Sequence, residues 1–329
     1  MFLSVLIPTH NPQPDRLRRT LAGLRAQTLS PAAWETILVD NASVPPVALA
    51  DYGGVAPPNA RRVPEPQLGL SAARRRGFAE ARGDYLVMVD DDNVLAPDYL
   101  AEVGRIFAAQ PQLGAIGGPS RPEYETAPPA WLREFEGLLA CRDFGPAVQL
   151  ASGLWNEPHE RNEYPPGAPI GAGMALRRSA LDAWLNEPTA TRLSDRRGGE
   201  LSSGGDNDIV LALLEQGWAV GYFPTLAVTH LIPSARTTRS YLARLNRGIA
   251  KSWVQVLTKH QACPWGPIPG WTVPLRQIKA WFVYRAWSGP AAYIRWRGAC
   301  GHFEGRASLA GFPARAGKPS RTGSSHSPP

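Results

Sequence analysis

Short apolar runs alternate with amphipathic segments along the first 120 residues. Three runs have the length and apolar content of buried strands, at residues 3–8, 35–39 and 84–89. Apolar side chains recur at helical spacing in residues 15–27, 70–82 and 97–109. Alternating strands and helices predict a mostly parallel central sheet with helices on both faces, an α/β fold that binds ligands at the carboxyl ends of its strands.

The pattern becomes less regular after a further predicted strand at residues 113–118. A segment rich in Pro, Gly and Trp follows, up to about residue 168. The sequence Gly171 to Leu176 predicts closely packed backbone that enters a short strand. Two helices, two strands and a long helix are predicted beyond it, at residues 178–185, 209–216, 218–223, 226–229 and 236–257.

These elements divide the chain into three expected parts. Residues 1–257 form one catalytic domain, with a nucleotide-binding half at 1–120 and an acceptor half at 121–257. Residues 258–312 form a basic, aromatic extension with a helical stretch around 276–297. Residues 313–329 are dominated by Pro, Gly, Ser, Arg and Lys, a composition that predicts a disordered tail.

Charge separates the extension from the rest of the chain. The net charge is +7, but residues 1–230 carry 20 basic and 27 acidic side chains, whereas residues 231–329 carry 15 basic side chains and only Glu304. The basic part also contains six tryptophans, Trp253, Trp265, Trp271, Trp281, Trp287 and Trp296. Such a mixture predicts peripheral association with an anionic membrane through residues 236–297. A solvated basic cover on the catalytic domain is the rival interpretation, and nucleic acid is a less favoured partner.

The expected location is the cytoplasm, with peripheral attachment at the inner face of the plasma membrane. No run has the length of a membrane span, and the apolar opening is too short for a signal peptide because it stops at Pro8. Cys141, Cys263 and Cys300 follow no metal-ligand spacing and form no even-numbered framework, as expected in a reducing compartment.

The clearest candidate chemistry is an acidic triplet, Asp90-Asp91-Asp92, at the end of a predicted buried strand. Three adjacent carboxylates repel one another unless a cation or hydrogen-bond donors compensate them. Mg²⁺ and Mn²⁺ prefer such oxygen ligands and commonly share them with substrate phosphates. A solvated turn or a helix cap is the alternative interpretation. Thr9 and Asp40 fall at the ends of neighbouring predicted strands.

A second acidic cluster, Gly205-Asp206-Asn207-Asp208, precedes the helix predicted at 209–216. The glycines before Asp206 leave space for a ligand, which favours a reactive role for its carboxylate. Asp208 is equally well interpreted as a helix cap. His230 follows the strand predicted at 226–229. A single histidine usually has a structural role, and only its position at a strand end makes His230 a candidate metal ligand.

Taken in order, these motifs resemble family 2 glycosyltransferases with the GT-A fold, over roughly residues 3–257. The resemblance rests on residues 5–11 (VLIPTHN), 37–43 (ILVDNAS), 69–74 (GLSAAR), 90–92 (DDD), 171–173 (GAG) and 205–208 (GDND), with His230 downstream. Residues 222–244 are similar to bacterial members that build surface or secreted polysaccharides.

The resemblance implies transfer of a sugar from a nucleoside-diphosphate donor, with inversion. Asp206 would be the general base, and Asp92 with His230 would bind Mn²⁺ or Mg²⁺. The nucleotide would contact Pro8, Thr9, Asn11, Asp40, Arg74, Asp90 and Asp91. The sugar pocket would include Gly171, Ala172, Gly173, Gly205 and Asp208. Arg74 could instead form an ion pair on the surface of its helix.

Several departures limit what the resemblance implies about the donor. Gly205 and Arg75 stand where the family often has Glu and Asn, and Asn93 replaces a common fourth Asp. The Gln-x-x-Arg-Trp signature of processive synthases does not follow Asp206, so we expect one sugar per encounter with a saccharide or lipid-linked acceptor. A nucleotidyltransferase acting on sugar phosphates and a non-catalytic nucleotide-sugar-binding protein are the alternatives. The presence of both Asp92 and Asp206 favours an enzyme.

Overall fold

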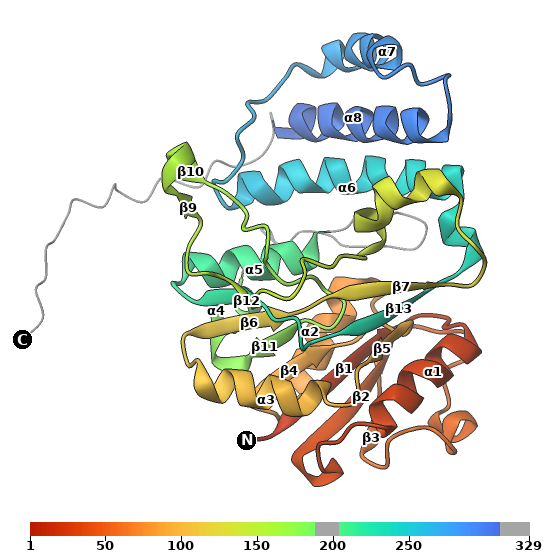
Figure 1. The fold of residues 1–329 in the computed structure, drawn as a ribbon, viewed down its shortest axis with the longest axis vertical. Coiled ribbons are helices and arrows are strands. Elements are labelled where there is room, and N and C mark those ends of the chain that lie inside the picture. Colours follow the sequence, from red (N-terminus) through yellow and green to blue (C-terminus); the bar gives the residue numbers. More distant parts are fainter. Residues whose placement is uncertain (188–203, 310–329) are drawn as a thin grey trace, which may run out of the picture.

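The computed structural model describes residues 1–187 and 204–309, and an eight-stranded sheet lies at the centre of this part (Figure 1). Its strands, in spatial order, are β3 (Ala60–Pro64), β2 (Trp34–Asp40), β1 (Leu3–Thr9), β4 (Tyr85–Met88), β11 (Ala175–Arg177), β6 (Leu113–Gly117), β12 (Ala219–Tyr222) and β8 (Gln149–Ala151). Strands β3, β2, β1 and β4 run parallel, as do β6 and β12, whereas β11 and β8 are antiparallel to their neighbours. The predicted mostly parallel sheet is confirmed.

Helices cover both faces of this sheet because side chains alternate along each strand. Val5 and Ile7 of β1 point into a core shared with α1 and α3, whereas Leu6 points into a core shared with α2 and α5. The helices are α1 (Pro14–Arg25), α2 (Leu70–Glu80), α3 (Tyr99–Ala109), α4 (Asp182–Leu185), α5 (Gly205–Glu215), α6 (Arg239–Lys259), α7 (Val273–Val283) and α8 (Pro290–Ser308).

Two smaller sheets were not expected from the sequence. One pairs β9 (Trp155–Asn156) with β10 (Arg161–Asn162), and the other has the order β5 (Asn93–Leu95), β13 (Val228–Ile232) and β7 (Ser120–Tyr124). The predicted end of a strand at His230 is wrong, because β13 has partners on both sides and continues to Ile232. His230 therefore lies inside β13, opposite Asn93 of β5.

The start of α5 also differs from the prediction. The helix begins at Gly205, so Asp206 and Asp208 lie in its first turn and do not precede it. Gly204 occupies the N-cap position, where a Cβ atom would lie 2.8 Å from Cγ2 of Val256 in α6. The close packing of α5 against α6 therefore fixes where the second acidic cluster lies.

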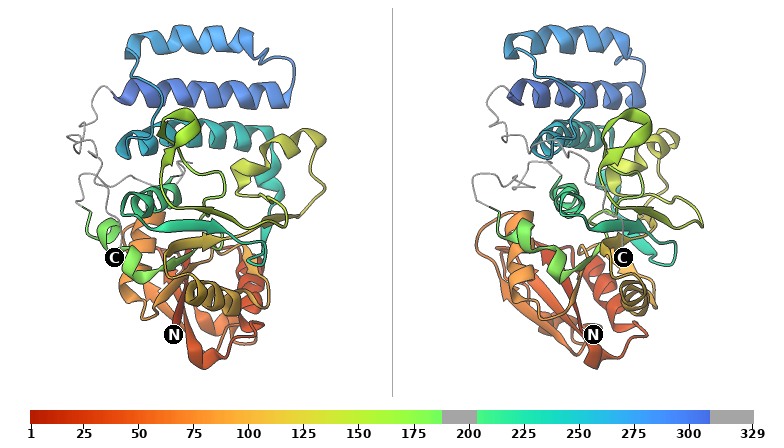
Figure 2. Two further views of the ribbon diagram at one scale, coloured as in Figure 1. Left: turned by 60° about the vertical axis from the view of Figure 1, so that its left-hand side comes forward. Right: turned by 90° about the vertical axis from the view of Figure 1, so that its left-hand side faces the viewer.

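Helices α6, α8 and α7 form successive layers at one end of the molecule (Figures 1 and 2). Helix α6 packs against α8 and the 3₁₀ helix η3 (Ala130–Leu139) through an apolar cluster that includes Leu242, Leu245 and Ile294. The helical C-terminal extension is confirmed, although it contains two helices joined near Gly289. The predicted domain boundary after residue 257 stays a prediction, and α6 runs across it. The predicted tail at 313–329 lies outside the described residues.

No helix in residues 1–187 or 204–309 combines the length and the apolar character that crossing a bilayer requires.

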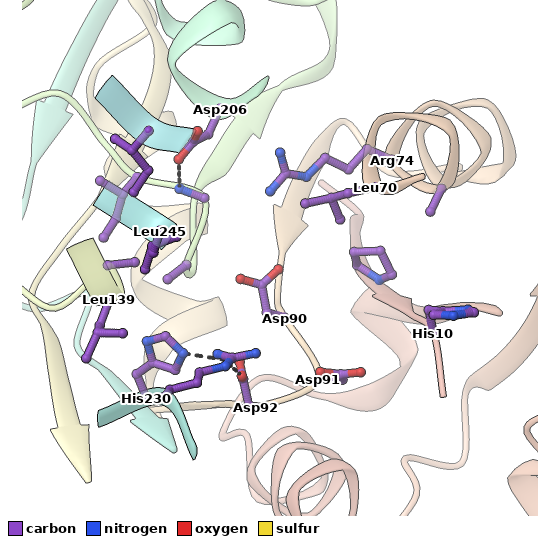
Figure 3. A pocket seen from close by; sticks show the side chains of 18 of the residues that line it. His10, Leu70, Arg74, Asp90, Asp91, Asp92, Leu139, Asp206, His230 and Leu245 are labelled. Atoms are coloured by element: carbon purple, nitrogen blue, oxygen red, sulfur yellow. Dashed lines mark hydrogen bonds and ion pairs between the residues drawn. The ribbon is translucent and has the colours of Figure 1, made fainter. Parts of the chain in front are cut away.

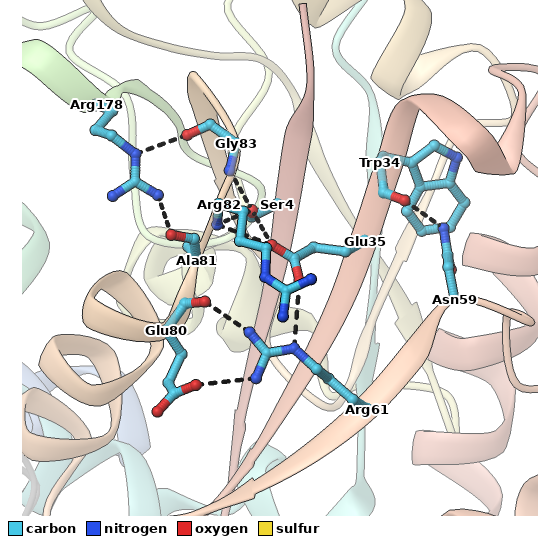
Figure 4. Close-up of polar contacts among 10 residues, drawn as sticks. All are labelled: Ser4, Trp34, Glu35, Asn59, Arg61, Glu80, Ala81, Arg82, Gly83 and Arg178. Atoms are coloured by element: carbon cyan, nitrogen blue, oxygen red, sulfur yellow. Dashed lines mark hydrogen bonds and ion pairs between the residues drawn. The ribbon is translucent and has the colours of Figure 1, made fainter.

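A polar network ties the amino ends of the strands together, at the edge of the sheet away from the acidic triplet (Figure 4). The buried Glu35 carboxylate accepts hydrogen bonds from Ser4 Oγ (2.8 Å), Arg82 N (2.8 Å) and Arg61 Nε (3.2 Å). Arg178 Nε donates to the carbonyl of Gly83 at 2.7 Å. Because an unpaired buried polar group is costly, these bonds hold the amino ends of neighbouring strands together.

Candidate active site

A cavity of about 620 Å³ lies at the carboxyl ends of β1 and β4, between the parallel part of the sheet and α6 (Figure 3). This volume is typical of small-molecule sites. Among the predicted site residues, those that line it are Pro8, Thr9, Arg74, Asp90, Asp91, Asp92, Gly171, Ala172, Asp206 and His230. The two acidic clusters, more than a hundred positions apart in the sequence, therefore meet in one cavity.

The acidic triplet follows β4 and contacts the end of β1. Thr9 Oγ1 donates a short hydrogen bond to Asp91. Burial, together with the neighbouring charge of Asp92, raises the pKa of Asp91 to about 7. Asp90 points into the middle of the cavity, on the side opposite Asp206 (Figure 3). Of the three carboxylates, Asp90 is the one most directly presented to a ligand.

Asp92 is buried and surrounded by positive or hydrogen-bonding groups. Its Oδ2 accepts a 2.8 Å bond from Arg236 Nη1, and its Oδ1 accepts a 3.1 Å bond from Asn93 Nδ2. His230 Nε2 lies 3.4 Å from Oδ1. Burial opposes ionisation, but His230 and Arg236 outweigh it and hold the pKa of Asp92 well below its usual range. Asp92 is therefore an ionised carboxylate across the neutral pH range.

The donor set at Asp92 fits a divalent cation that is shared with a substrate. His230 Nε2 is buried, and its 3.4 Å contact with Asp92 Oδ1 lacks the geometry of a well-formed hydrogen bond. A carboxylate is a preferred ligand of Mn²⁺ and Mg²⁺, and an imidazole nitrogen is a common ligand of divalent first-row metals. Within residues 1–187 and 204–309 no three His, Cys, Asp or Glu side chains are grouped to hold a metal by themselves. The remaining ligands would therefore come from phosphate oxygens, the usual arrangement for Mg²⁺.

Asp206 lies in the first turn of α5 and is held by the backbone of the segment before β11. The N–H of Gly171 donates a 2.9 Å hydrogen bond to Asp206 Oδ2. A Cβ atom at position 171 would lie 3.0 Å from Arg74 Nη2 and 3.3 Å from Asp206 Oδ2. Glycine at this position therefore allows Arg74 and Asp206 to approach the same point of the cavity wall.

Asn11 and Asp40, both predicted to contact the nucleotide, do not line the cavity. Asn11 Oδ1 accepts a 2.9 Å bond from the N–H of Val44, which joins the loops after β1 and β2. The Asp40 carboxylate is buried and accepts bonds from Arg62 Nη2 (2.7 Å) and the N–H of Val47 (3.0 Å). Burial opposes its ionisation, but hydrogen bonds from Ser43 and Arg62 lower the pKa of Asp40. Their nucleotide contacts stay predictions.

Asn41, next to Asp40, does line the cavity, and it orders the segment before α2. Its Nδ2 donates to the carbonyls of Glu65 (3.0 Å) and Gln67 (2.8 Å), and its Oδ1 accepts a 2.8 Å bond from Gly69 N. This segment brings Leu68, Gly69 and Leu70 to the cavity wall. In the sequence, the feature that could have indicated Asn41 is its position next to Asp40 at the end of a predicted strand.

Gly173, Gly205 and Asp208 were predicted for the sugar pocket and also lie outside the cavity lining. Gly173 has φ +78°, and a Cβ atom there would lie 2.6 Å from Val228 Cγ2, so its role in the fold is close packing. Gly205 is the first residue of α5.

Asp208 belongs to a buried ionic cluster behind the cavity wall. Its carboxylate accepts bonds from Trp184 Nε1 (2.8 Å), Lys259 Nζ (2.7 Å) and His260 Nε2 (2.8 Å). Burial opposes its ionisation, but His260 and Lys259 lower the pKa of Asp208. Its contacts join α5 to the end of α6 and to α4, so Asp208 holds together the elements around Asp206.

The opposite wall of the cavity comes from α6 and was missed in the sequence. Tyr241, Leu245, Ile249 and Trp253 line it at intervals of four residues, which places them on one face of the helix. The Trp253 ring packs edge-on against Tyr164, with ring centroids 5.1 Å apart. The sequence groups Trp253 with the tryptophans predicted to contact a membrane, whereas the structure places it in the cavity lining. The helical spacing of these residues was the sequence feature that could have predicted this wall of the cavity. Such spacing usually indicates a helix face buried in the hydrophobic core.

Known proteins resemble parts of this chain. Residues 4–185, more than half of the chain, match the family model described as "Glycosyl transferase family 2". The chain is 33% identical over 118 residues to the O-antigen biosynthesis protein RfbC of Myxococcus xanthus, a match that covers 35% of this chain and 9% of the relative. It is 33% identical over 103 residues to the succinoglycan biosynthesis protein ExoW of Rhizobium meliloti, covering 30% of this chain and 31% of the relative.

A longer match has lower identity. The glucosyl-dolichyl phosphate glucuronosyltransferase of Haloferax volcanii is 23% identical over 247 residues, which cover 74% of this chain and 73% of that protein. Among solved structures, the mannosyltransferase PcManGT of Pyrobaculum calidifontis, determined in complex with GDP-mannose and Mn²⁺, aligns with a TM-score of 0.52 at 19% identity. That alignment covers 88% of this chain and 72% of the other, and it confirms the predicted GT-A fold. From the family match and the fold together, we conclude that this chain belongs to glycosyltransferase family 2.

Proposed function

We propose that the protein is an inverting, non-processive glycosyltransferase. It moves a sugar from a nucleoside-diphosphate donor to a saccharide or lipid-linked saccharide acceptor, in the biosynthesis of a surface or extracellular polysaccharide. The observation that carries the proposal is the presence of Asp90 and Asp92 in the same cavity as Asp206. Two separate acidic clusters suit a reaction in which one cluster binds a diphosphate and the other takes a proton from a hydroxyl group.

In this proposal, the donor lies against the strand ends, with its nucleotide beside Pro8, Thr9, Asn41 and Arg74. Asp92 and His230 would hold a Mn²⁺ or Mg²⁺ ion, which would supply Lewis-acid stabilisation of the diphosphate. Arg236, 2.8 Å from Asp92, adds a permanent positive charge at the same place. This charge supports departure of the nucleoside diphosphate, since fixed charges stabilise a developing anion without reorganisation.

Asp206 is the general base. The acceptor hydroxyl oxygen forms a bond to the anomeric carbon while the bond from that carbon to the diphosphate oxygen breaks. The hydroxyl proton passes to the Asp206 carboxylate, and the nucleoside diphosphate leaves with the bonding electrons. Displacement from the opposite side inverts the anomeric centre. The hydrogen bond from Gly171 N–H to Asp206 Oδ2 supports this role because it fixes the carboxylate orientation.

The acceptor approaches along α6. Trp253, Tyr241 and Leu245 offer the aromatic and apolar surface that saccharide rings pack against. We propose that the enzyme works in the cytoplasm, at the inner face of the plasma membrane, where a lipid-linked acceptor would be presented.

The test is release of nucleoside diphosphate from a panel of nucleotide sugars with saccharide and lipid-linked acceptors. Asp206→Asn is expected to lower kcat by about 100-fold or more, the usual contribution of a general base, while nucleotide-sugar binding is retained. The matched control is Asp182→Asn, at an exposed carboxylate of α4 that does not line the cavity. Turnover by Asp206→Asn at the wild-type rate would remove Asp206 from the mechanism.

A further inference from the structure

Helix α7 presents a stripe of large apolar side chains to solvent. Trp271, in the turn before the helix, is followed by Leu275, Ile278 and Phe282 at intervals of four, three and four residues, so all four lie on one helix face. Their side chains are 76%, 62%, 58% and 63% exposed. Trp287, just beyond the helix, is also exposed. Four adjacent apolar side chains with this exposure form a patch of the kind that marks an interaction site.

The stripe is exposed although α7 itself is firmly packed. The opposite face of the helix meets α8, where the rings of Trp281 and Trp296 lie 4.8 Å apart and Trp296 Nε1 donates a 3.0 Å bond to the carbonyl of Gln277. Ala280 is the buried residue on this side. In Figures 1 and 2, α7 is the outermost layer of the molecule, and α8 lies between it and α6. Because the inner face of α7 already packs against α8, the apolar stripe on its outer face is available to bind a partner.

Charge indicates which partner this surface fits. Arg276 and Lys279 project from the exposed part of α7, and Arg285 follows at its end. Residues 231–329 as a whole carry 15 basic side chains and a single acidic one, Glu304. Helices that lie in a membrane interface combine exposed Trp, Phe and Leu with Lys and Arg, and anionic lipids attract the basic side chains.

We propose that α7 docks the protein on an anionic phospholipid bilayer. The helix lies in the plane of the membrane, with Trp271, Leu275, Ile278 and Phe282 inserted at the boundary between headgroups and acyl chains. Arg276 and Lys279 contact lipid phosphates beside the stripe. This membrane-binding surface is smaller than the one expected from the sequence, which spans residues 236–297. Helix α6 does not belong to it, because α6 is enclosed between the cavity and α8. Since packed helices lie 8–10 Å apart, the cavity side of α6 stands about 20 Å above the bilayer.

The test is flotation of the full chain with vesicles of phosphatidylcholine alone or mixed with phosphatidylglycerol. No nucleotide sugar is present, so the result does not depend on the transfer reaction. Wild-type protein is expected to bind the mixed vesicles, and to bind them less at high salt. The variant Trp271→Ser/Leu275→Ser/Ile278→Ser/Phe282→Ser is expected to bind about tenfold more weakly or worse. The matched control, Val148→Ser/Trp155→Ser, removes exposed apolar side chains elsewhere and should bind like wild type.

A second pair of variants tests the charges separately. Arg276→Gln/Lys279→Gln is expected to weaken binding to the mixed vesicles, whereas Arg82→Gln/Arg133→Gln, at exposed positions outside the extension, should not. All variants should keep the wild-type melting temperature and nucleotide binding, because the substituted side chains are exposed and lie outside the cavity. Failure of wild type to bind mixed vesicles would overturn the proposal. So would unchanged binding by the stripe variant, or stripe-dependent dimerisation without vesicle binding, which would assign α7 to a second copy of the chain.

Discussion

The backbone N–H of Gly171 donates a 2.9 Å hydrogen bond to the carboxylate of Asp206, 35 positions later in the chain. This bond joins the segment before β11 to the first turn of α5. It sets the direction of the carboxylate that we propose as the general base. The relationship depends on the absence of a side chain at position 171, because a Cβ atom there would press on both Arg74 and Asp206.

Gly171→Ala should therefore impair transfer without unfolding the protein. The added methyl would lie 3.0 Å from Arg74 Nη2 and 3.3 Å from Asp206 Oδ2, and a displacement of this kind near reacting groups lowers kcat by about 100-fold. Steady-state kinetics measures the loss. Gly137→Ala is the matched control: this residue also lines the cavity, but a Cβ atom there would meet nothing within 4 Å. Equal rates for the two variants would show that Gly171 does not position Asp206.

Trp253→Ala should weaken use of the acceptor and leave donor binding intact. Its ring lies in the α6 wall, opposite the strand ends proposed to hold the nucleotide. Loss of this surface should raise KM for the acceptor by about tenfold with a smaller change in kcat, the pattern expected when binding common to ground state and transition state is removed. Trp253→Phe should recover much of the affinity, and Trp155→Ala, at an exposed site outside the cavity, should change neither constant. A rise in KM for the donor alone would contradict this assignment.

The buried cluster around Asp208 should make stability depend on pH through His260. Burial disfavours the charged ring, but hydrogen bonds to Asp208 and Glu215 outweigh it and raise the pKa of His260 above its ordinary value. The folded state therefore holds a proton that the unfolded state has lost. This stabilisation is complete below the unfolded pKa of about 6.5 and disappears as pH rises through the raised folded pKa.

Denaturant unfolding at about pH 6 and about pH 9 measures the effect. The wild-type free energy of unfolding should fall across this interval by more than that of His260→Gln. The difference should be about 1.4 kcal/mol for each unit that separates the folded and unfolded pKa values. His302→Gln is the control with the opposite sign, because burial and Arg306 lower the pKa of His302. Identical pH profiles for wild type and His260→Gln would mean that the cluster does not hold this proton.

The strand ends were the part of the site that the sequence predicted well. Apolar runs before Thr9, Asp40 and Asp90 identify buried parallel strands, and the carboxyl ends of such strands meet at one edge of the sheet. The short strands β5 and β7 escaped prediction because they contain polar residues and Pro122, and both pair with β13, which is distant in the sequence. Their pairing carries His230 to Asp92, a contact that local sequence patterns do not encode.

The wall of the cavity formed by α6 could not be predicted from the sequence for a different reason. A stripe such as Tyr241, Leu245, Ile249 and Trp253 has the spacing of a buried helix face, and only the tertiary arrangement reveals that a cavity lies against it. The same limit applies to Asp208, whose position at a helix start suggested a cap or a sugar contact. Its partners Lys259 and His260 lie some fifty residues away, at the end of α6. Local spacing predicts elements, whereas side chains from distant elements complete the site.

Thermal unfolding tests the proposed diphosphate site: wild type and Asp92→Ala are compared with a panel of nucleoside diphosphates and nucleotide sugars, each with and without Mn²⁺. A ligand that binds only the folded state stabilises it, by about 2.7 kcal/mol at a concentration one hundred times its Kd. We expect that one nucleotide raises the wild-type melting temperature only when Mn²⁺ is present, that Asp92→Ala loses this shift, and that the exposed control Asp98→Ala keeps it. Stabilisation that is the same without Mn²⁺, or that survives in Asp92→Ala, would contradict a diphosphate site built on Asp92.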